Sequence, residues 1–389
     1  MIASTQYRFA PRPLAIDGAP LGRSLVLAIF AGWTLFSVFI YSRYSMLGDA
    51  QAYLEGGYGE SSFTQGRTLL ITRIAGGLRS VLGMDVLVHL AFSMFAAAGV
   101  CHLASRADLR GRQRWPLLLI LLNPNFGVWA SVTGRESLFV GLMGFFMGAV
   151  LGHYRRGRGI GAMLLAALAA AGMVYLRAPF GLGAALFFLV YLMFAWGPRL
   201  RLSVGVRALF FVLLASVALY VAWPQIDAFI GAEVLPQARS YFTVTSATTR
   251  TWVDLRSTGD LLANVWWMAP LALVGPTPME VLSRPIMLPF FAAGLLVLGL
   301  LLRAAYTALF KLHEPPRAVV LLGWLPATVM MLVAYTPFGI YNPGSGIRYA
   351  SCFLLFLILP LLLPAARSTT AGQGGAGHGL HGGTMEGMR

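Results

Sequence analysis

The sequence predicts an all-α bundle of about ten membrane-spanning helices, with both termini in the cytoplasm and interfacial helices on the outer face. Of the 389 residues, 58% are hydrophobic and only 11% are charged. Apolar runs of about 17 to 20 residues recur along the chain, which is the length that crosses a bilayer. A soluble domain carries about a quarter charged residues. This composition therefore excludes a soluble enzyme, a nucleic-acid-binding protein and a disordered chain.

The apolar windows define ten candidate spans. They cover residues 24–41, 84–104, 115–132, 137–154, 160–176, 180–196, 207–223, 286–302, 318–336 and 349–364. We interpret the first as a retained anchor, because Tyr41-Ser42-Arg43-Tyr44 lacks the small residues of a signal-peptide cleavage site. The predicted domains are a cytoplasmic segment 1–23, a transmembrane domain 24–366 with outer loops 42–83 and 224–285, and a flexible glycine-rich cytoplasmic tail 367–389.

Basic residues predict the orientation of these spans. With the N-terminus inside, 18 of the 29 Lys and Arg residues and four of the 14 acids fall in cytoplasmic segments. The net charge of +15 then divides into +14 inside and +1 outside, as expected when Lys and Arg near span ends stay in the cytoplasm. In the outer loops, residues 68–75 predict an interfacial helix. Segment 261–276, with Trp266 and Trp267, is interfacial or re-entrant.

Ionisable residues at the outer ends of spans are the candidates for function, since a charge there costs several kcal/mol unless it is paired or hydrated. They are Asp49, Arg135, Glu136, Arg177, Glu280, Arg284 and Arg348. Asp49 could act as a general base or bind a divalent cation. It could equally be the N-cap of a short interfacial helix. Both interpretations of Asp49 remain open at this point.

The segment 123–136 joins the third and fourth spans. Pro124 breaks the helix within the membrane, and Asn123 and Asn125 need hydrogen-bond partners there. Arg135 and Glu136 open the next helix, whose positive end favours Glu136. An Arg–Glu pair at such a turn can be purely structural. The broken helix and the two amides lead us to favour a functional site.

Arg177 and Arg348 each stand at the outer end of a span. Each could extend to lipid headgroups. If they converge with Arg135, they would instead form a pyrophosphate clamp, because guanidinium groups bind phosphate oxygens bidentately. The rigid turn 274–280 presents Glu280 to the same face, although a plain loop turn fits as well.

Cofactor and metal motifs are lacking in the sequence. Cys101 and Cys352 are interpreted as free, membrane-buried thiols. His378 and His381 lie in the glycine-rich tail, which we expect to be solvated. We therefore predict no cofactor, and only Asp49 leaves room for a divalent cation.

Three motifs resemble those of bacterial polytopic glycosyltransferases of the GT-C superfamily, particularly the exopolysaccharide and O-antigen polymerase-like branch. They are Gly48-Asp49 with Tyr53, the run Pro124, Trp129, Ser131, Arg135 and Glu136, and the late Gly344, Arg348 and Tyr349. The turn 276–280 also resembles a Pro-x-Pro-Trp-Glu element, with Met279 in place of the tryptophan.

The resemblance implies an enzyme of the bacterial inner membrane that serves cell-surface polysaccharide assembly. It would transfer sugar from a polyprenyl-(di)phosphate-linked donor to an acceptor at the periplasmic face. Asp49 and Glu136 would be its catalytic residues, and the donor would be bound by Arg135, Arg177, Glu280, Arg348 and Tyr349.

The expected partners are the polyprenyl-linked glycan, the lipid bilayer and other polysaccharide-assembly proteins, with no nucleic acid. Two alternatives remain. One is a transporter or flippase of a lipid-linked glycan. The other is a non-catalytic subunit of a polysaccharide machine.

Overall fold

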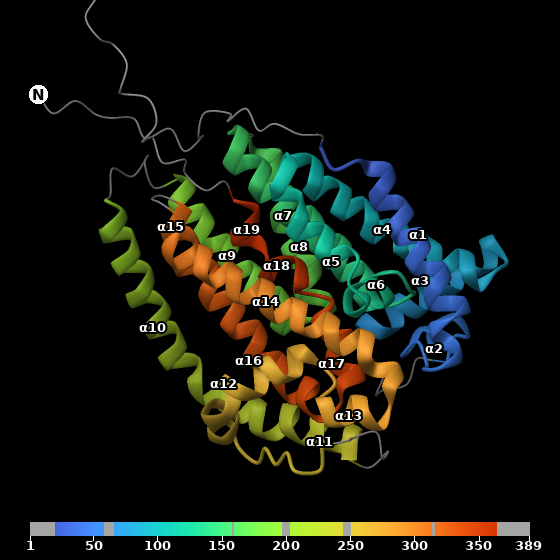
Figure 1. Cartoon of the computed structure of the whole chain (residues 1–389). Helices are drawn as coiled ribbons and strands as arrows, with labels where there is room; N and C mark the ends of the chain where they lie inside the picture. Colours follow the sequence, from blue (N-terminus) through green and yellow to red (C-terminus); the bar gives the residue numbers. More distant parts are fainter. Residues whose placement is uncertain are drawn as a thin grey trace, which may run out of the picture.

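The computed structural model describes residues 20–57, 66–157, 159–196, 203–243, 250–312 and 316–363. These residues form a bundle of α-helices (Figure 1), and no β-strand occurs among them apart from one isolated bridge between Pro20 and Arg110. The long helices are α1 (Arg23–Phe39), α4 (Asp85–Arg106), α7 (Arg135–Arg156), α8 (Ile160–Leu176), α9 (Ala178–Trp196), α10 (Val204–Phe229), α12 (Thr258–Val274), α14 (Leu288–Phe310) and α16 (Leu325–Tyr341). The all-α prediction is confirmed for the described chain.

Seven helical segments of this part are long and apolar enough to cross a membrane. They are Arg23–Arg43, Asp85–Arg106, Arg135–Arg155, Ala178–Ala195, Val204–Ser240, Pro285–Phe310 and Pro316–Tyr341. The apolar helix α8 is somewhat shorter. Together these eight coincide with eight of the ten predicted spans. The chain thus has the helices of a multi-pass membrane protein.

The two remaining predicted spans, 115–132 and 349–364, are broken. The first consists of α5 (Trp115–Leu121) and α6 (Pro124–Ala130), and the second of α18 (Leu354–Leu357) and α19 (Leu359–Leu362). Residues 350–360 are all buried within the bundle, where α18 packs on α7, α14 and α5. Irregular backbone is tolerated at membrane depth only where protein covers it, and this burial meets that condition.

The two loops predicted to lie on the outer side contain most of the remaining helices. Loop 42–83 forms the short helix α2 (Ala50–Leu54) and the helix α3 (Gly66–Leu82), which includes the predicted stretch 68–75. Loop 224–285 holds α11 (Leu235–Thr243), α12 and α13 (Pro278–Ser283). α10 continues past its predicted end at residue 223 and joins α11 through the π-turn 230–234, because Pro224 is accommodated inside the helix. The short helices α15 (Pro316–Val319) and α17 (Pro343–Ala350) flank α16.

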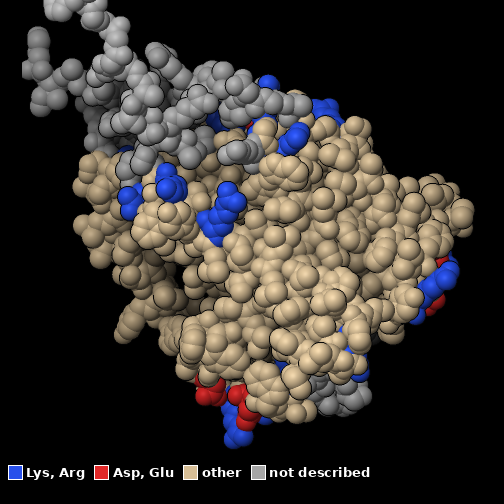
Figure 2. Space-filling view, viewed as in Figure 1, with Lys and Arg blue, Asp and Glu red and all other residues tan. Residues whose placement is uncertain are grey.

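The two ends of the bundle differ in charge. In the view of Figure 2, a wide uncharged surface lies between Lys and Arg side chains gathered at one end and acids standing beside arginines at the other. Contacts tie together segments that the sequence places in the cytoplasm: Leu21 N donates to Leu109 O at 3.2 Å, and Arg155 at the end of α7 donates to Gln113 Oε1 at 3.4 Å. Loops predicted to share a face therefore meet at one end of the bundle.

Glycines allow α4 and α7 to pack closely. A Cβ added at Gly99 of α4 would lie only 2.8 Å from Gly141 Cα, and one at Gly144 of α7 would lie 2.7 Å from Val100 N. Small residues at helix interfaces let backbones approach in this way, which strengthens packing in a membrane.

Gly144→Ala is therefore expected to lower the free energy of unfolding by about 1–3 kcal/mol, because the added methyl must push α4 and α7 apart. Gly161→Ala in α8 is the matched control, since a Cβ there meets nothing within 4 Å. Denaturant unfolding of both variants measures the effect. Equal stabilities would show that this interface is looser than the structure indicates.

Candidate functional site

Asp49 lies at the start of α2, held there by the glycine before it. Gly48 has a φ of +60°, and a Cβ at this position would lie 2.8 Å from Arg348 Cζ. Only glycine fits both the left-handed backbone and the close guanidinium. Asp49 occupies the N-cap position of α2, but its side chain makes no capping hydrogen bond. It accepts instead from Arg348 Nη2 at 2.7 Å. The predicted N-cap position of Asp49 is thus confirmed, while its side chain binds an arginine and not the helix end.

Glu136 is the buried centre of the site. It stands in the first turn of α7 with its side chain 3% exposed. Its Oε1 accepts from Arg348 Nε at 2.6 Å and also from Arg177 Nη2. The neighbouring Arg135 reaches the other carboxylate, with its Nη2 3.8 Å from Asp49 Oδ2. Glu136 therefore joins two arginines from distant parts of the chain, rather than pairing with Arg135.

Local sequence signals position these arginines. Arg177 is the C-cap of α8. The helix stops there because Pro179, near the start of α9, cannot continue it. Arg348 lies in α17, whose start is fixed by Asn342: its side chain accepts from Gly344 N at 2.8 Å and from Ser345 N at 3.3 Å.

Aromatic rings support both guanidinium groups. Arg177 Cζ lies 4.3 Å from the ring centroid of Tyr349, and Arg348 Cζ lies 5.7 Å from that of Trp129. The Arg177 and Arg348 side chains are only 12% and 13% exposed. The alternative that they extend to lipid headgroups is therefore wrong, because both are buried and paired.

The cluster of Asp49, Arg135, Glu136, Arg177 and Arg348, called the arginine cluster below, carries an excess of positive charge. Three arginines face two carboxylates. The Nε atoms of Arg135 and Arg177 are buried and make no hydrogen bond with any described residue. Buried donors normally have a partner, so these N–H groups suit an anion that enters the site.

Arg67 and Tyr53 border the arginine cluster, and sequence reasoning did not assign Arg67 to it. Burial lowers the pKa of Arg67, and the positive charges of Arg135 and Arg177 lower this pKa further. Tyr53 is fully buried, and this burial raises its pKa. Arg67 lies in α3, where its regular spacing with Arg73 and Arg79 looked like an ordinary interfacial helix. Only the tertiary fold reveals its position.

Glu280 is engaged elsewhere. It forms a capping box with Thr277 and pairs with Arg250, whose Nη2 lies 3.0 Å from Glu280 Oε2. Arg250 is 1% exposed and also donates to Ile340 O at 3.0 Å and to Gly275 O. This ion pair closes the loop between α12 and α13 onto α16. The plain-turn alternative therefore describes the position of Glu280 better than donor binding does.

The amides of the broken helix are structural. Asn123 caps α6 through Asn125 N and donates to Ala293 O at 2.9 Å, while Asn125 donates to Phe290 O at 3.1 Å. His89 accepts from Thr133 N at 2.9 Å just before α7 begins. These bonds attach the α6–α7 turn to α14 and α4, and so hold Arg135 and Glu136 in place.

The described residues contain no group of three or more His, Cys, Asp or Glu side chains that could hold a metal ion. Asp49 and Glu136 both face arginines, a donor set that suits an anion rather than a cation. His378 and His381 lie outside the described residues. Cys101 and Cys352 are free thiols.

Fold and site together define an all-α protein of the multi-pass membrane type with a buried arginine cluster at one end of its bundle. Comparison with known proteins adds no relative: no protein-family model, curated protein or solved structure matches the chain.

Proposed function

We propose that the protein is a glycosyltransferase of the GT-C type that uses a polyprenyl-(di)phosphate-linked sugar donor at the periplasmic face of a bacterial inner membrane, in cell-surface polysaccharide assembly. The proposal includes ten spans, counting the two broken segments, with both termini in the cytoplasm. It also places α2 and α3 at the periplasmic interface. The lipid bilayer, the lipid-linked glycan and other polysaccharide-assembly proteins are its proposed partners.

The arginine cluster is the observation that carries the proposal. Three arginines from separate segments converge on two carboxylates, with an excess positive charge and two buried N–H groups unused by the described residues. Breaking the bond between a sugar and a lipid diphosphate places negative charge on the leaving group. Preorganised donors stabilise such charge more strongly in a buried site than in water, so no nucleotide is needed to drive this step.

The two carboxylates suit different roles. The Asp49 side chain is 32% exposed and that of Glu136 only 3%. Asp49 can therefore receive the proton of an acceptor hydroxyl. The oxygen of that hydroxyl then bonds to the sugar carbon, while the bond between this carbon and the diphosphate oxygen breaks. Glu136 is the positioning residue, because it fixes the guanidinium groups of Arg177 and Arg348.

The position of the cluster favours an enzyme over a transporter. Its residues lie at the ends of α7 and α8 and in α17, whereas transport sites usually lie near the bilayer midplane. A non-catalytic subunit would not need buried guanidinium N–H groups without partners, so we do not advance it.

Asp49→Asn is expected to reduce sugar transfer by about 10²–10⁴-fold, because the amide cannot take a proton. Chain extension of a polyprenyl-diphosphate glycan by the purified protein measures this loss. The matched control is Glu55→Gln, at an exposed position at the other end of α2, which should retain activity. If the wild type extends nothing while liposomes containing it translocate the lipid, the protein is a flippase.

The topology has its own test. Two cysteine substitutions at exposed positions, Ser45→Cys and Gly159→Cys, are made separately in a Cys101→Ala background. Ser45→Cys should react with an impermeant maleimide added on the periplasmic side. Gly159→Cys should react only after the membrane is opened. The opposite pattern would invert the orientation and place the arginine cluster in the cytoplasm.

A further inference from the structure

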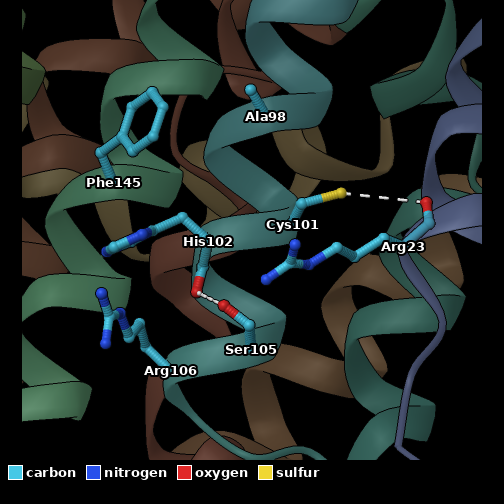
Figure 3. Close-up of a pocket in the computed structure, with 7 residues that line it drawn as sticks. All are labelled: Arg23, Ala98, Cys101, His102, Ser105, Arg106 and Phe145. Atoms are coloured by element: carbon cyan, nitrogen blue, oxygen red, sulfur yellow. Dashed lines mark hydrogen bonds between the residues drawn. The ribbon is translucent and has the colours of Figure 1, made fainter.

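A cavity of about 550 Å³ lies between the start of α1, the end of α4 and the middle of α7, away from the arginine cluster. Its walls combine cationic and apolar groups. Figure 3 shows Arg23 reaching from α1 towards α4, with His102 and Arg106 extending from α4 on the side where Phe145 of α7 lies. Three groups that can bind an anion therefore surround one space.

The two arginines are available for a ligand. Neither the Arg23 nor the Arg106 guanidinium hydrogen-bonds or ion-pairs with another described residue, and Asp108, the acid nearest to Arg106 in sequence, is bound by Arg110 at 2.8 Å. Ser105 already donates to His102 O at 3.0 Å. A site whose wall has two guanidinium groups that no described residue neutralises favours a phosphate group, which arginine binds through paired N–H donors.

An apolar surface leads from these arginines along the bundle. The ring of Phe145 lies 5.5 Å from that of His102 and 5.9 Å from that of Phe95, measured between centroids. Phe95 precedes His102 by two turns of α4 and is 36% exposed. The aromatic row therefore runs from the charged end of α4 towards the middle of this spanning helix, the direction in which an acyl chain extends from its headgroup.

We propose that this cavity binds an anionic membrane phospholipid, with the phosphate held by Arg23 and Arg106 and an acyl chain lying along Phe145 and Phe95. The site stands at the basic end of the bundle. Juxtamembrane arginines are attracted to the anionic lipids of the cytoplasmic leaflet. The inference does not depend on the proposed transferase activity.

Cys101 is a natural reporter of occupancy. It lines the cavity and is partly exposed, with its Sγ 3.9 Å from Arg23 O, whereas the second cysteine, Cys352, is fully buried. Phosphatidylglycerol added to the purified full-length protein should slow maleimide labelling of Cys101 by about tenfold, and native mass spectrometry should show the retained lipid. Phosphatidylcholine and inorganic phosphate are the comparison ligands, one lacking the net charge and the other the acyl chains.

Arg23→Gln and Arg106→Gln should each weaken phosphatidylglycerol binding by about tenfold, the effect of one lost charge-assisted contact. Arg303→Gln is the matched control, because Arg303 is exposed on α14 outside the cavity. Ala98→Trp should exclude the lipid by filling the cavity from an exposed position of α4 without any change of charge.

Three results would overturn the proposal. Equal protection by phosphatidylcholine would mean that the anionic charge is not recognised. Equal protection by inorganic phosphate would assign the cavity to a soluble anion. Equal loss of binding in Arg303→Gln would show diffuse attraction to the basic end rather than a site.

Discussion

Glu136→Gln is expected to lower the free energy of unfolding by about 3–5 kcal/mol, the cost of leaving buried charges without their partner. The wild-type carboxylate is 3% exposed and binds both Arg177 and Arg348. An amide keeps the shape but removes the charge, so two guanidinium groups face each other across a neutral residue. Unfolding in detergent, followed by helical circular dichroism, measures the change.

Asp254→Asn is the matched control for this substitution. Asp254 also pairs with two arginines, Arg239 at 2.9 Å and Arg256 at 2.5 Å, but its side chain is 40% exposed. Exposed ion pairs contribute about 0–1 kcal/mol, so this variant should unfold almost like the wild type. Equal losses in the two variants would mean that the Glu136 site is hydrated.

A double substitution separates the ion pair from general damage. Arg177→Met removes one of the two cations that Glu136 neutralises, so Glu136→Gln should cost less in that background than in the wild type. The non-additivity between residues in contact is typically about 0.5–3 kcal/mol. Strict additivity would show that Glu136 and Arg177 do not interact.

The sequence predicted the helices well because length and hydropathy decide them locally. The eight apolar helices that coincide with predicted spans follow from apolar runs, and the broken segment 115–132 follows in part from Pro124, which cannot continue a helix. The break in 349–364 was not predicted, because its residues are as apolar as those of a regular span. Its irregular backbone depends on burial against α7 and α14, which no local pattern encodes.

The arginine cluster was predictable for a different reason. In a chain with so few charges, an ionisable residue at a span end is conspicuous, and this signal selected Asp49, Arg135, Glu136, Arg177 and Arg348. It could not distinguish Glu280, which looks the same in sequence but pairs with Arg250 instead. Arg67 was missed because charges are expected on an interfacial helix. Which charges meet depends on how segments far apart in the chain pack together.

Arg348→Lys is expected to reduce the proposed sugar transfer by about 10²–10³-fold while keeping the positive charge. The guanidinium places Nε 2.6 Å from Glu136 and Nη2 2.7 Å from Asp49 at the same time. A lysine ammonium is a point charge on a flexible stem and cannot hold this fork. Removing one preorganised hydrogen-bond donor from a site where negative charge develops reduces the turnover rate by a factor of this size. Arg284→Lys, at an exposed position of the α13 end, should leave turnover unchanged.

Gly48→Ala tests the role of the Arg348 guanidinium without changing Arg348 itself. The added methyl would collide with Arg348, whose Cζ would lie 2.8 Å away, and would displace it from Asp49. Gly56→Ala is the matched control, because Gly56 has a similar φ of +71° with nothing within 4 Å of an added Cβ. Both variants bear the same backbone strain, so only Gly48→Ala should lose transfer. Full activity in Gly48→Ala, with the protein folded, would remove Arg348 from the reaction and leave the arginine cluster a purely structural feature.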